Sequence, residues 1–321
     1  MCNLKGLEVK QRLAAKLLDS LPGLLTLPPS VFRKVARVVE RLSGLPKVSM
    51  KSITSLRIPL STCDQSINAR LYQPQKISGG TLVYYHGGGC VVGGLDTHDR
   101  LIRYLAHYSG VNIISVEYRL APEAKFPDPI NDAIDAWNWI VSNEDLNIGL
   151  SSLGVAGDSA GAYLAAIISL REEQNKLAVQ AVRLPDFQFL IYPMVDLRGS
   201  ANSYSEFGSG LILTNKLMDY FVKHYLTAPE QVNDSLASLV LSNVLSSSPK
   251  TYVLTVEYDP LRDSGFDFVN KLRGENIDVV HEHLHDCMHA FPTVGRVSSR
   301  AREATVELAL ALKDFVKYSQ N

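Results

Sequence analysis

The chain has little of what marks several large classes of protein. It contains four cysteines in 321 residues (Cys2, Cys63, Cys90 and Cys287), and no two are spaced as C-x-x-C. This spacing excludes a disulfide-rich scaffold, and free thiols in a reducing compartment are expected. The net charge is −1, so the chain lacks the basic excess that nucleic-acid binding requires.

Long apolar runs are also missing. None approaches the roughly 20 residues of a transmembrane helix, and Asp19 and Pro22 interrupt the only candidate signal-peptide region. We therefore expect no integral membrane segment and a cytoplasmic location. Hydrophobic residues make up 46% of the chain and charged residues 20%, which is enough for the large buried core of an enzyme.

Apolar runs of strand length alternate with helical patterns from residue 53 onward. Such alternation predicts parallel strand–helix–strand units and therefore an α/β fold. The expected strands lie near residues 53–60, 67–73, 81–85, 112–118, 153–157, 187–192, 251–257 and 277–283. The strand pattern stops between Asp196 and Val244, where a helix capped by Thr214 is expected.

Two amphipathic helices are predicted before residue 50. The first has an apolar face made by Leu7, Leu13, Leu17, Leu18 and Leu21. The second is expected to begin with Ser30 as its N-cap. Its basic residues are expected to form a solvated face, with contact to an anionic membrane as the alternative; they are Arg33, Lys34, Arg37 and Arg41.

The stretch Gly157-Asp158-Ser159-Ala160-Gly161 carries the strongest chemical signal. An apolar strand precedes it and an apolar helix follows it. In this context G-x-S-x-G predicts a nucleophile elbow, a sharp turn that exposes the serine above a sheet. The alternative is a helix N-terminus capped by Asp158 or Ser159.

A second expected strand ends at His86-Gly87-Gly88-Gly89. Three consecutive glycines leave backbone N–H groups uncovered, and such groups bind anions. In acyl transfer the anion is the oxygen of a tetrahedral intermediate. The alternative, a phosphate loop, needs a following Lys-Ser or Lys-Thr or a G-x-G-x-x-G spacing, and neither is present. We expect His86 to brace the loop by hydrogen bonding.

Two residues downstream can complete a serine hydrolase in the chain order Ser, acid, His. Asp259 follows a buried strand, although as Asp-Pro it also fits the N-cap and N1 positions of a helix. Glu257 and Asp263 are weaker candidates for the acid. His289 lies between the last expected strand and the final helix, where it can take the proton of Ser159 while Asp259 orients the imidazole.

The last expected strand also holds a cluster of histidines. His281, His283 and His285 alternate along it and so share one face. This resembles a metal cluster, but further ligands and supporting partners are not evident in the sequence. A half-exposed strand face is the simpler interpretation, and no metal site is predicted.

Together these motifs resemble the hormone-sensitive-lipase family of α/β-hydrolases, in its bacterial carboxylesterase branch. The resemblance covers most of the chain from about Leu56 onward. It rests on residues 86–89, 95–99, 116–123, 126–127, 157–161, 259–263 and 289–291. It implies an α/β-hydrolase fold, with a mostly parallel eight-stranded sheet flanked by helices and a helical cap.

The resemblance also implies roles for particular segments and residues. The catalytic core would span residues 51–196 and 247–321, and residues 1–50 and 197–246 would form a cap over the active site. The implied catalytic residues are Ser159 as nucleophile, Asp259 as acid and His289 as base. The implied oxyanion donors are the backbone N–H groups of Gly88, Gly89 and Ala160.

The sequence departs from the family pattern at three positions. Cys90 stands where an aromatic residue usually follows the glycines, Ala290 replaces a common glycine, and Ser264 replaces a common glutamate. None of the three removes a catalytic group. Cys90 is expected to alter the size of the substrate pocket. The candidate lining residues are Cys90, Tyr192, Tyr204, Phe207, Leu211 and Met288.

The expected function is a serine carboxylesterase that hydrolyses short- to medium-chain acyl esters through an acyl-enzyme intermediate. No metal or organic cofactor is required by this chemistry, and the expected partner is a small-molecule ester. The alternatives are an amide, carbamate or lactone hydrolase on the same triad, or a non-catalytic receptor on this fold. A homodimer is expected by family analogy alone.

Overall fold

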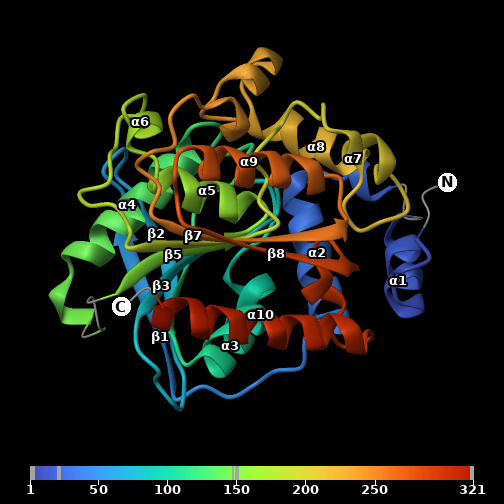
Figure 1. The fold of residues 1–321 in the computed structure, drawn as a ribbon, viewed down its shortest axis with the longest axis horizontal. Helices are drawn as coiled ribbons and strands as arrows, with labels where there is room; N and C mark the ends of the chain where they lie inside the picture. The colour runs from blue at the N-terminus through green and yellow to red at the C-terminus, as the bar shows by residue number, and fades with distance from the viewer. Residues whose placement is uncertain (1–3, 20–22, 147, 149–151, 319–321) are drawn as a thin grey trace.

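The computed structural model describes residues 4–19, 23–146, 148 and 152–318. Among them is an eight-stranded sheet with the strand order β1-β2-β4-β3-β5-β6-β7-β8 (Figure 1). β2 runs antiparallel to both of its neighbours, and the other pairings are parallel. The strands are β1 Ser52–Pro59, β2 Ser66–Gln73, β3 Thr81–Tyr85, β4 Asn112–Glu117, β5 Leu153–Asp158, β6 Phe187–Ile191, β7 Lys250–Tyr258 and β8 Val279–Met288.

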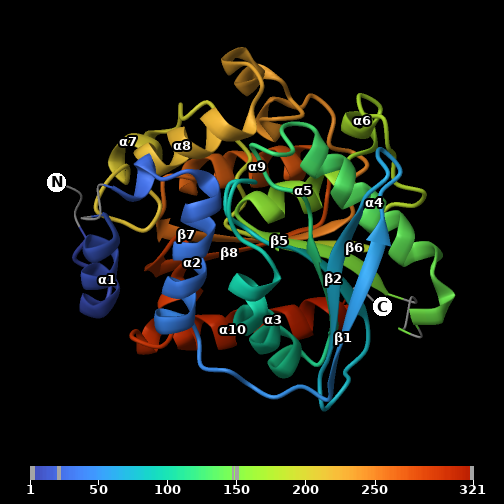
Figure 2. The same cartoon turned by 180° about the vertical axis from the view of Figure 1, so that it is seen from behind.

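Helices cover both faces of the sheet (Figures 1 and 2). One face carries α3 (Leu95–Ser109) and α10 (Ser299–Tyr318), and the other carries α4 (Asp128–Ser142), α5 (Ala160–Ile168) and α9 (Arg262–Gly274). Every residue of β3, β5 and β6 is buried, as expected for parallel strands covered on both sides. The α/β-hydrolase architecture predicted above is confirmed.

The remaining helices lie outside these two layers. They are α1 Val9–Asp19, α2 Pro29–Ser43, α6 Arg171–Gln174, α7 Asn202–Glu206 and α8 Asn215–Tyr225, with 3-10 turns η1 Leu24–Thr26, η2 Glu144–Leu146, η3 Pro229–Asn233, η4 Leu239–Leu241 and η5 Phe291–Val294. None of the helices in the described ranges combines the length and apolar character that a membrane span requires.

The N-terminal helices differ from the predictions in three details. Pro28 stands at the N-cap of α2, so Ser30 lies inside the helix instead of capping it. Lys34, Arg37 and Arg41 are exposed as expected, but Arg33 donates to the carbonyls of Val91 (2.8 Å) and Ala121 (2.6 Å) instead of facing solvent. Leu13 and Leu17 of α1 are 62% and 66% exposed whereas Leu7 is buried, so the predicted apolar face is only partly packed inward; residue 21 lies outside the described residues.

The last strand also differs from its prediction. β8 begins at Val279 and continues to Met288, five residues beyond the expected end. Its register with β7 is irregular between Val256 and Tyr258, where β8 contributes extra residues. Apolar alternation does not predict the end of this strand, because the side chains there are mostly polar.

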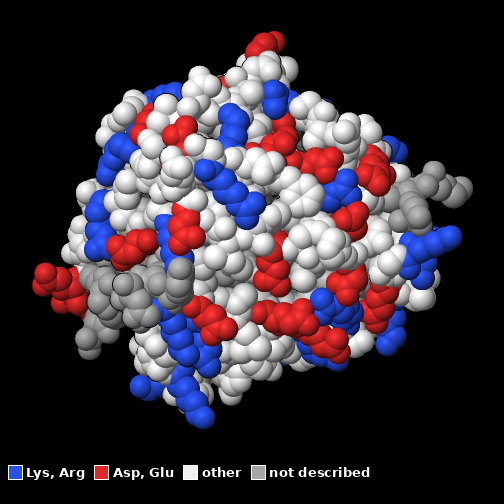
Figure 3. All heavy atoms as spheres, in the orientation of Figure 1, with Lys and Arg blue, Asp and Glu red and all other residues white. Residues whose placement is uncertain are grey.

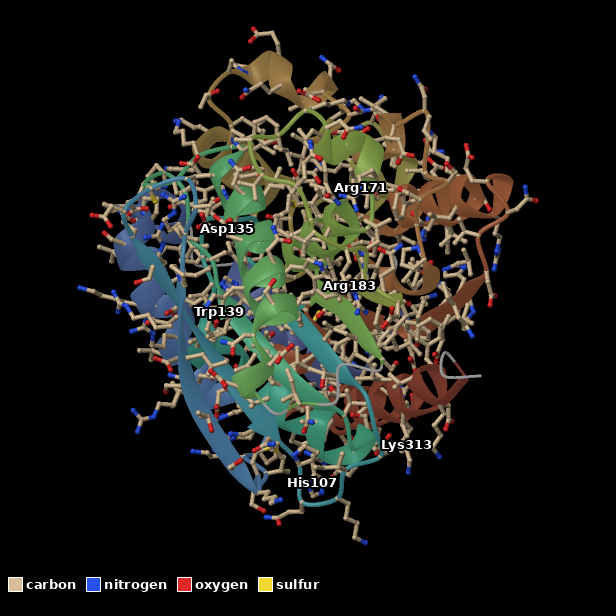
Figure 4. The ribbon with its side chains drawn as sticks, turned by 90° about the vertical axis from the view of Figure 1, so that its left-hand side faces the viewer. His107, Asp135, Trp139, Arg171, Arg183 and Lys313 are labelled. Carbon is tan, nitrogen blue, oxygen red and sulfur yellow. The ribbon has the colours of Figure 1, made fainter. Side chains whose placement is uncertain are left out.

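A buried carboxylate holds the turn between β1 and β2. Asp135 on α4, labelled in Figure 4, accepts hydrogen bonds from the N–H (2.8 Å) and hydroxyl (2.7 Å) of Ser61, just after the end of β1.

Charged side chains of both signs are interspersed over the face seen in Figure 3, consistent with the near-zero net charge.

Candidate active site

Ser159 occupies the turn between β5 and α5. Its backbone has a positive φ of 53° with ψ −118°, a conformation that a non-glycine residue seldom adopts. A side chain at Gly157 would overlap the backbone of Gly161, which is why the reversal requires a glycine there. The turn therefore lifts the Ser159 hydroxyl above the carboxyl end of the central strand.

Asp259, His289 and Ser159 form a continuous hydrogen-bonded relay. Asp259 Oδ2 lies 2.7 Å from His289 Nδ1, and His289 Nε2 lies 3.0 Å from Ser159 Oγ. The three residues are buried, and Ser159 is 8% exposed. They come from the loop after β7, the loop after β8 and the elbow after β5. Their strands are neighbours or nearly so in the sheet, and parallel strands bring these loops to one edge.

Asp259 also makes the contact of a helix cap, so its two expected roles are compatible. α9 is assigned from Arg262 with Leu261 at the N-cap, but Asp259 Oδ1 accepts from the Leu261 N–H (2.8 Å), two residues on, as a capping aspartate does. Glu257 and Asp263 both bind Arg262, at 2.7 and 2.8 Å. Of these three carboxylates, Asp259 is therefore the one that contacts His289.

The glycine loop lies beside this relay. Gly88 has φ 117° and Gly89 has φ 62°, and a side chain at Gly89 would overlap the ring of Phe221 on α8. Within the described part of the chain, the N–H groups of Gly88, Gly89 and Ala160 donate to no other residue. Ala160 is the first residue of α5, where a helix leaves its N–H groups without intrahelical partners.

His86 lies beneath the loop. Its ring stacks on Tyr118 at a centroid distance of 4.3 Å, and its Nδ1 lies 2.8 Å from the Gly87 carbonyl oxygen. Burial lowers the pKa of His86 to about 3, so the ring is neutral. The Nδ1–H therefore donates to the loop, which is the bracing contact expected from the sequence.

The sequence reasoning missed a second buried pair behind the nucleophile. Asp158 Oδ1 accepts from the Tyr84 hydroxyl (2.7 Å) and the Gly87 N–H (2.9 Å). His98 Nε2 lies 3.3 and 3.4 Å from the two carboxylate oxygens. A cavity of about 30 Å³ adjoins Asp158, His98 and Tyr192. From the sequence, Asp158 is expected only as a possible helix cap, and residues 95–99 only contribute to the family resemblance.

The pKa shifts of both residues favour their charged forms. Burial alone would raise the pKa of Asp158, but the His98 charge and the donated hydrogen bonds outweigh it, and the pKa is lowered. Burial alone would lower the pKa of His98, but Asp158 reverses that effect and the pKa is raised. Each residue therefore favours the charged form of the other, beside the nucleophile turn.

The six candidate pocket residues are placed at different depths. The Tyr192 ring lies 4.5 Å from the His289 ring. Cys90 is wholly buried, and this burial raises the pKa of its thiol to about 12. Met288 and Leu211 are also buried. The aromatic rings of the cap segment, Tyr204 and Phe207, contact other protein groups: the Tyr204 hydroxyl donates to Asp219 (3.3 Å), and Phe207 packs against Tyr258 at 5.8 Å.

Phe221 is a further neighbour of the site that sequence reasoning did not select. Its ring lies against Gly89 and is 6% exposed. Nothing in the sequence distinguished it, because it lies in an ordinary amphipathic helix. Only the packing of α8 on the glycine loop reveals it.

Comparisons with known proteins agree with this geometry. A family model described as alpha/beta hydrolase fold matches residues 82–293. The ethyl acetate hydrolase of Pseudomonas putida is 36% identical over 263 residues, which is 80% of this chain and 81% of that protein. The arylesterase of Saccharolobus solfataricus is 31% identical over 291 residues, covering 89% and 92% of the two chains.

Solved structures are similar over nearly the whole chain. An ester hydrolase from the metagenome of Lake Arreo, complexed with a bipyridine phosphonate derivative, superposes with a TM-score of 0.87 at 32% identity, covering 96% of this chain and 98% of that one. The protein therefore belongs to the alpha/beta hydrolase fold family, among its carboxylic ester hydrolases.

Proposed function

We propose that the protein hydrolyses small acyl esters with Ser159 as nucleophile, His289 as general base and Asp259 as the residue that orients His289. The observation that carries this proposal is the relay itself, with contacts of 2.7 and 3.0 Å ending at a serine on a strained turn. A serine hydroxyl needs an adjacent base to attack a carbonyl, and the relay supplies one.

Proton movement follows from the hydrogen bonds. Asp259 accepts the Nδ1–H of His289, which leaves the Nε2 lone pair directed at the Ser159 hydroxyl. When Ser159 attacks the ester carbonyl, His289 takes its proton and then passes that proton to the leaving alcohol. Water, deprotonated by the same imidazole, then attacks the acyl-enzyme, and His289 returns the proton to Ser159.

The oxyanion is assigned to three backbone donors. The N–H groups of Gly88, Gly89 and Ala160 have no other acceptor in the described ranges, and they adjoin the serine. Such preorganised donors stabilise the charge that develops on the carbonyl oxygen, and losing one typically costs about a hundredfold to a thousandfold in turnover.

Residues 1–50 and 197–246 are proposed to form a cap over this site. Phe32 of α2 packs edge-on against Tyr220 of α8 at 5.6 Å, and the Tyr220 hydroxyl donates to the Leu27 carbonyl (3.0 Å). These contacts join the two segments. Because Ser159 is 8% exposed beneath them, substrate entry would require part of the cap to move.

A small acyl group is the proposed substrate class. The matched relatives are named ethyl acetate hydrolase and acetyl esterase, and both names specify two-carbon acyl groups. The six pocket candidates of the sequence analysis, together with Phe221, are proposed to limit acyl size. The finer placement in the bacterial carboxylesterase branch, a cytoplasmic location and a homodimer remain part of the proposal.

Hydrolysis of p-nitrophenyl esters from acetate to palmitate tests the proposal, with and without a serine-directed organophosphate and with EDTA. We expect a maximum at a short acyl chain, complete loss with the organophosphate and no effect of EDTA. A folded protein that hydrolyses no ester would instead support an amidase or a receptor on this fold.

A further inference from the structure

A second group of chemically active side chains lies away from the serine, where β7 and β8 pair. It consists of Glu257, His283 and His285. Glu257 Oε2 and His283 Nε2 are 2.9 Å apart, and one ligand atom from each of the three residues lies within 4.8 Å of the others. The sequence alone indicates histidines on one strand with no ligand from another segment. In the structure, Glu257 of β7 supplies that additional ligand.

A buried hydroxyl supports this group from behind. Thr255 is 1% exposed, and its Oγ1 lies 2.9 Å from His283 Nδ1. An imidazole held at Nδ1 presents Nε2 to a metal, and such supporting hydrogen bonds are typical of metal-binding histidines. His285 is exposed and its ring lies edge-on to His283 at 4.5 Å, so it is free to turn toward a shared ion.

The local charge favours a cation. Arg262 binds three carboxylates, those of Glu206 (3.1 Å), Glu257 (2.7 Å) and Asp263 (2.8 Å). This one guanidinium balances only one of the three carboxylates that it binds, which favours a further cation beside Glu257. Arg262 contacts Glu257 through Oε1, and Oε2 is the oxygen directed at His283.

We propose that Glu257 Oε2, His283 Nε2 and a ring nitrogen of His285 bind a divalent first-row transition cation such as Zn²⁺ or Ni²⁺. Two imidazoles and a carboxylate suit these ions. In the metal-bound form His283 Nε2 faces the ion and its Nδ1–H donates to Thr255 Oγ1, and any proton held on Nε2 is released to solvent. The proposed metal site is separate from the catalytic relay, and ester hydrolysis does not require the ion.

Binding would join two strands that lead to the active site. Glu257 lies two residues before Asp259, and His285 lies four residues before His289. Since the ligands come from two strands that are held together only in the folded chain, the ion should bind the native state preferentially. Native-state binding stabilises a protein in proportion to the logarithm of the ligand concentration.

The test is a titration of the full, tag-free, metal-free protein with Zn²⁺. Calorimetry measures the binding, and the melting temperature is recorded at each Zn²⁺ concentration. We expect one ion per chain at this site and a melting temperature that rises with Zn²⁺ concentration. Glu257→Gln, His283→Asn and His285→Asn should each weaken binding at least about tenfold. His285→Asn is the most informative variant because the residue is exposed and its loss should not affect folding.

His281→Asn is the matched control. His281 lies on the same strand and also contacts Thr255, at 2.9 Å through Nε2, but it is outside the proposed ligand set. Its variant should bind Zn²⁺ as the wild type does, and so should Ser159→Ala, which separates this result from the esterase proposal. Absence of binding up to millimolar Zn²⁺, or binding that survives loss of His285, would overturn the assignment. Weakening by His281→Asn equal to that by His285→Asn would do the same.

Discussion

The carboxylate of Asp158 accepts a 2.9 Å hydrogen bond from the backbone N–H of Gly87. The residue before the nucleophile therefore holds the start of the glycine loop. His98 and the Tyr84 hydroxyl hold the same carboxylate. This relationship couples the position of the serine to that of two of the three proposed oxyanion donors, Gly88 and Gly89, which lie one and two residues beyond Gly87.

Replacing Asp158 with Asn should lower turnover more than substrate affinity. The amide keeps the shape of the side chain but loses the charge that faces His98, so the loop should be held less firmly. Because the loop donors act mainly on the transition state, we expect kcat to fall about tenfold to a hundredfold with little change in KM. Steady-state kinetics on a p-nitrophenyl ester measures both constants.

Tyr84→Phe provides the control for that variant. It removes one hydrogen bond to Asp158 but leaves the carboxylate, His98 and the Gly87 contact in place, so the loss of kcat should be smaller. A purely structural role of Asp158 would instead lower the folded fraction of Asp158→Asn without a selective loss of kcat.

The His98–Asp158 pair should make stability depend on pH in a defined direction. The folded-state pKa of His98 is raised and that of Asp158 is lowered. The His98 contribution is thus fully present below the ordinary imidazole pKa of about 6.5 and is lost as pH rises through the raised value. The Asp158 contribution is lost only in strong acid.

His98→Gln should accordingly destabilise the protein most near pH 6. We expect a loss of about 1.5–3 kcal/mol in the free energy of unfolding there, the range for a hydrogen bond to a charged group. The difference from wild type should shrink toward pH 9, as measured by urea denaturation at several pH values. A difference that grows with pH would show that His98 is neutral in the folded protein.

Esterase activity should fall in acid. A protonated His289 cannot accept the Ser159 proton, so kcat/KM should be lost on the acid side of the pH profile. The profile is measured from pH 8 to pH 5 at constant ionic strength. A flat profile over this range would contradict the role of His289 as general base.

Phe221 should limit the length of the acyl chain that the site accepts. Its ring packs on Gly89, beside the proposed oxyanion donors, so Phe221→Leu should enlarge the space there while keeping an apolar side chain. We expect the ratio of kcat/KM for octanoate over butyrate esters to rise about threefold or more, within the range for one or two methylene contacts.

Phe266→Leu is the control for the acyl-chain measurement. Phe266 packs on His281 and His283 at 5.3 and 5.2 Å, away from the glycine loop, and its replacement should leave the ratio unchanged. An unchanged ratio in Phe221→Leu would place the acyl group elsewhere.

Much of this fold follows from local sequence patterns. Buried strands such as β3 and β5 are short apolar runs bounded by glycine or polar residues, and the elbow at Ser159 requires its glycines for steric reasons. The end of β8 could not be predicted in this way, because its histidines and acidic residues are polar and the strand is stabilised by pairing with β7. Tertiary pairing overrides local pattern there.

Contacts between distant segments could not be predicted from the sequence for the same reason. Arg33 reads as a surface residue of an amphipathic helix, but it binds carbonyls 58 and 88 positions away. His98 and Asp158 are 60 positions apart, and nothing local indicates that they meet. Glu257 is likewise an ordinary strand residue until β8 places His283 beside it.

Turnover of Ser159→Ala on a short-chain p-nitrophenyl ester tests the central claim most directly. The hydroxyl is the proposed nucleophile, so kcat/KM should fall at least about a thousandfold, while circular dichroism and melting temperature stay close to wild type. A folded Ser159→Ala protein that retains wild-type turnover would contradict the nucleophile assignment and the mechanism built on it.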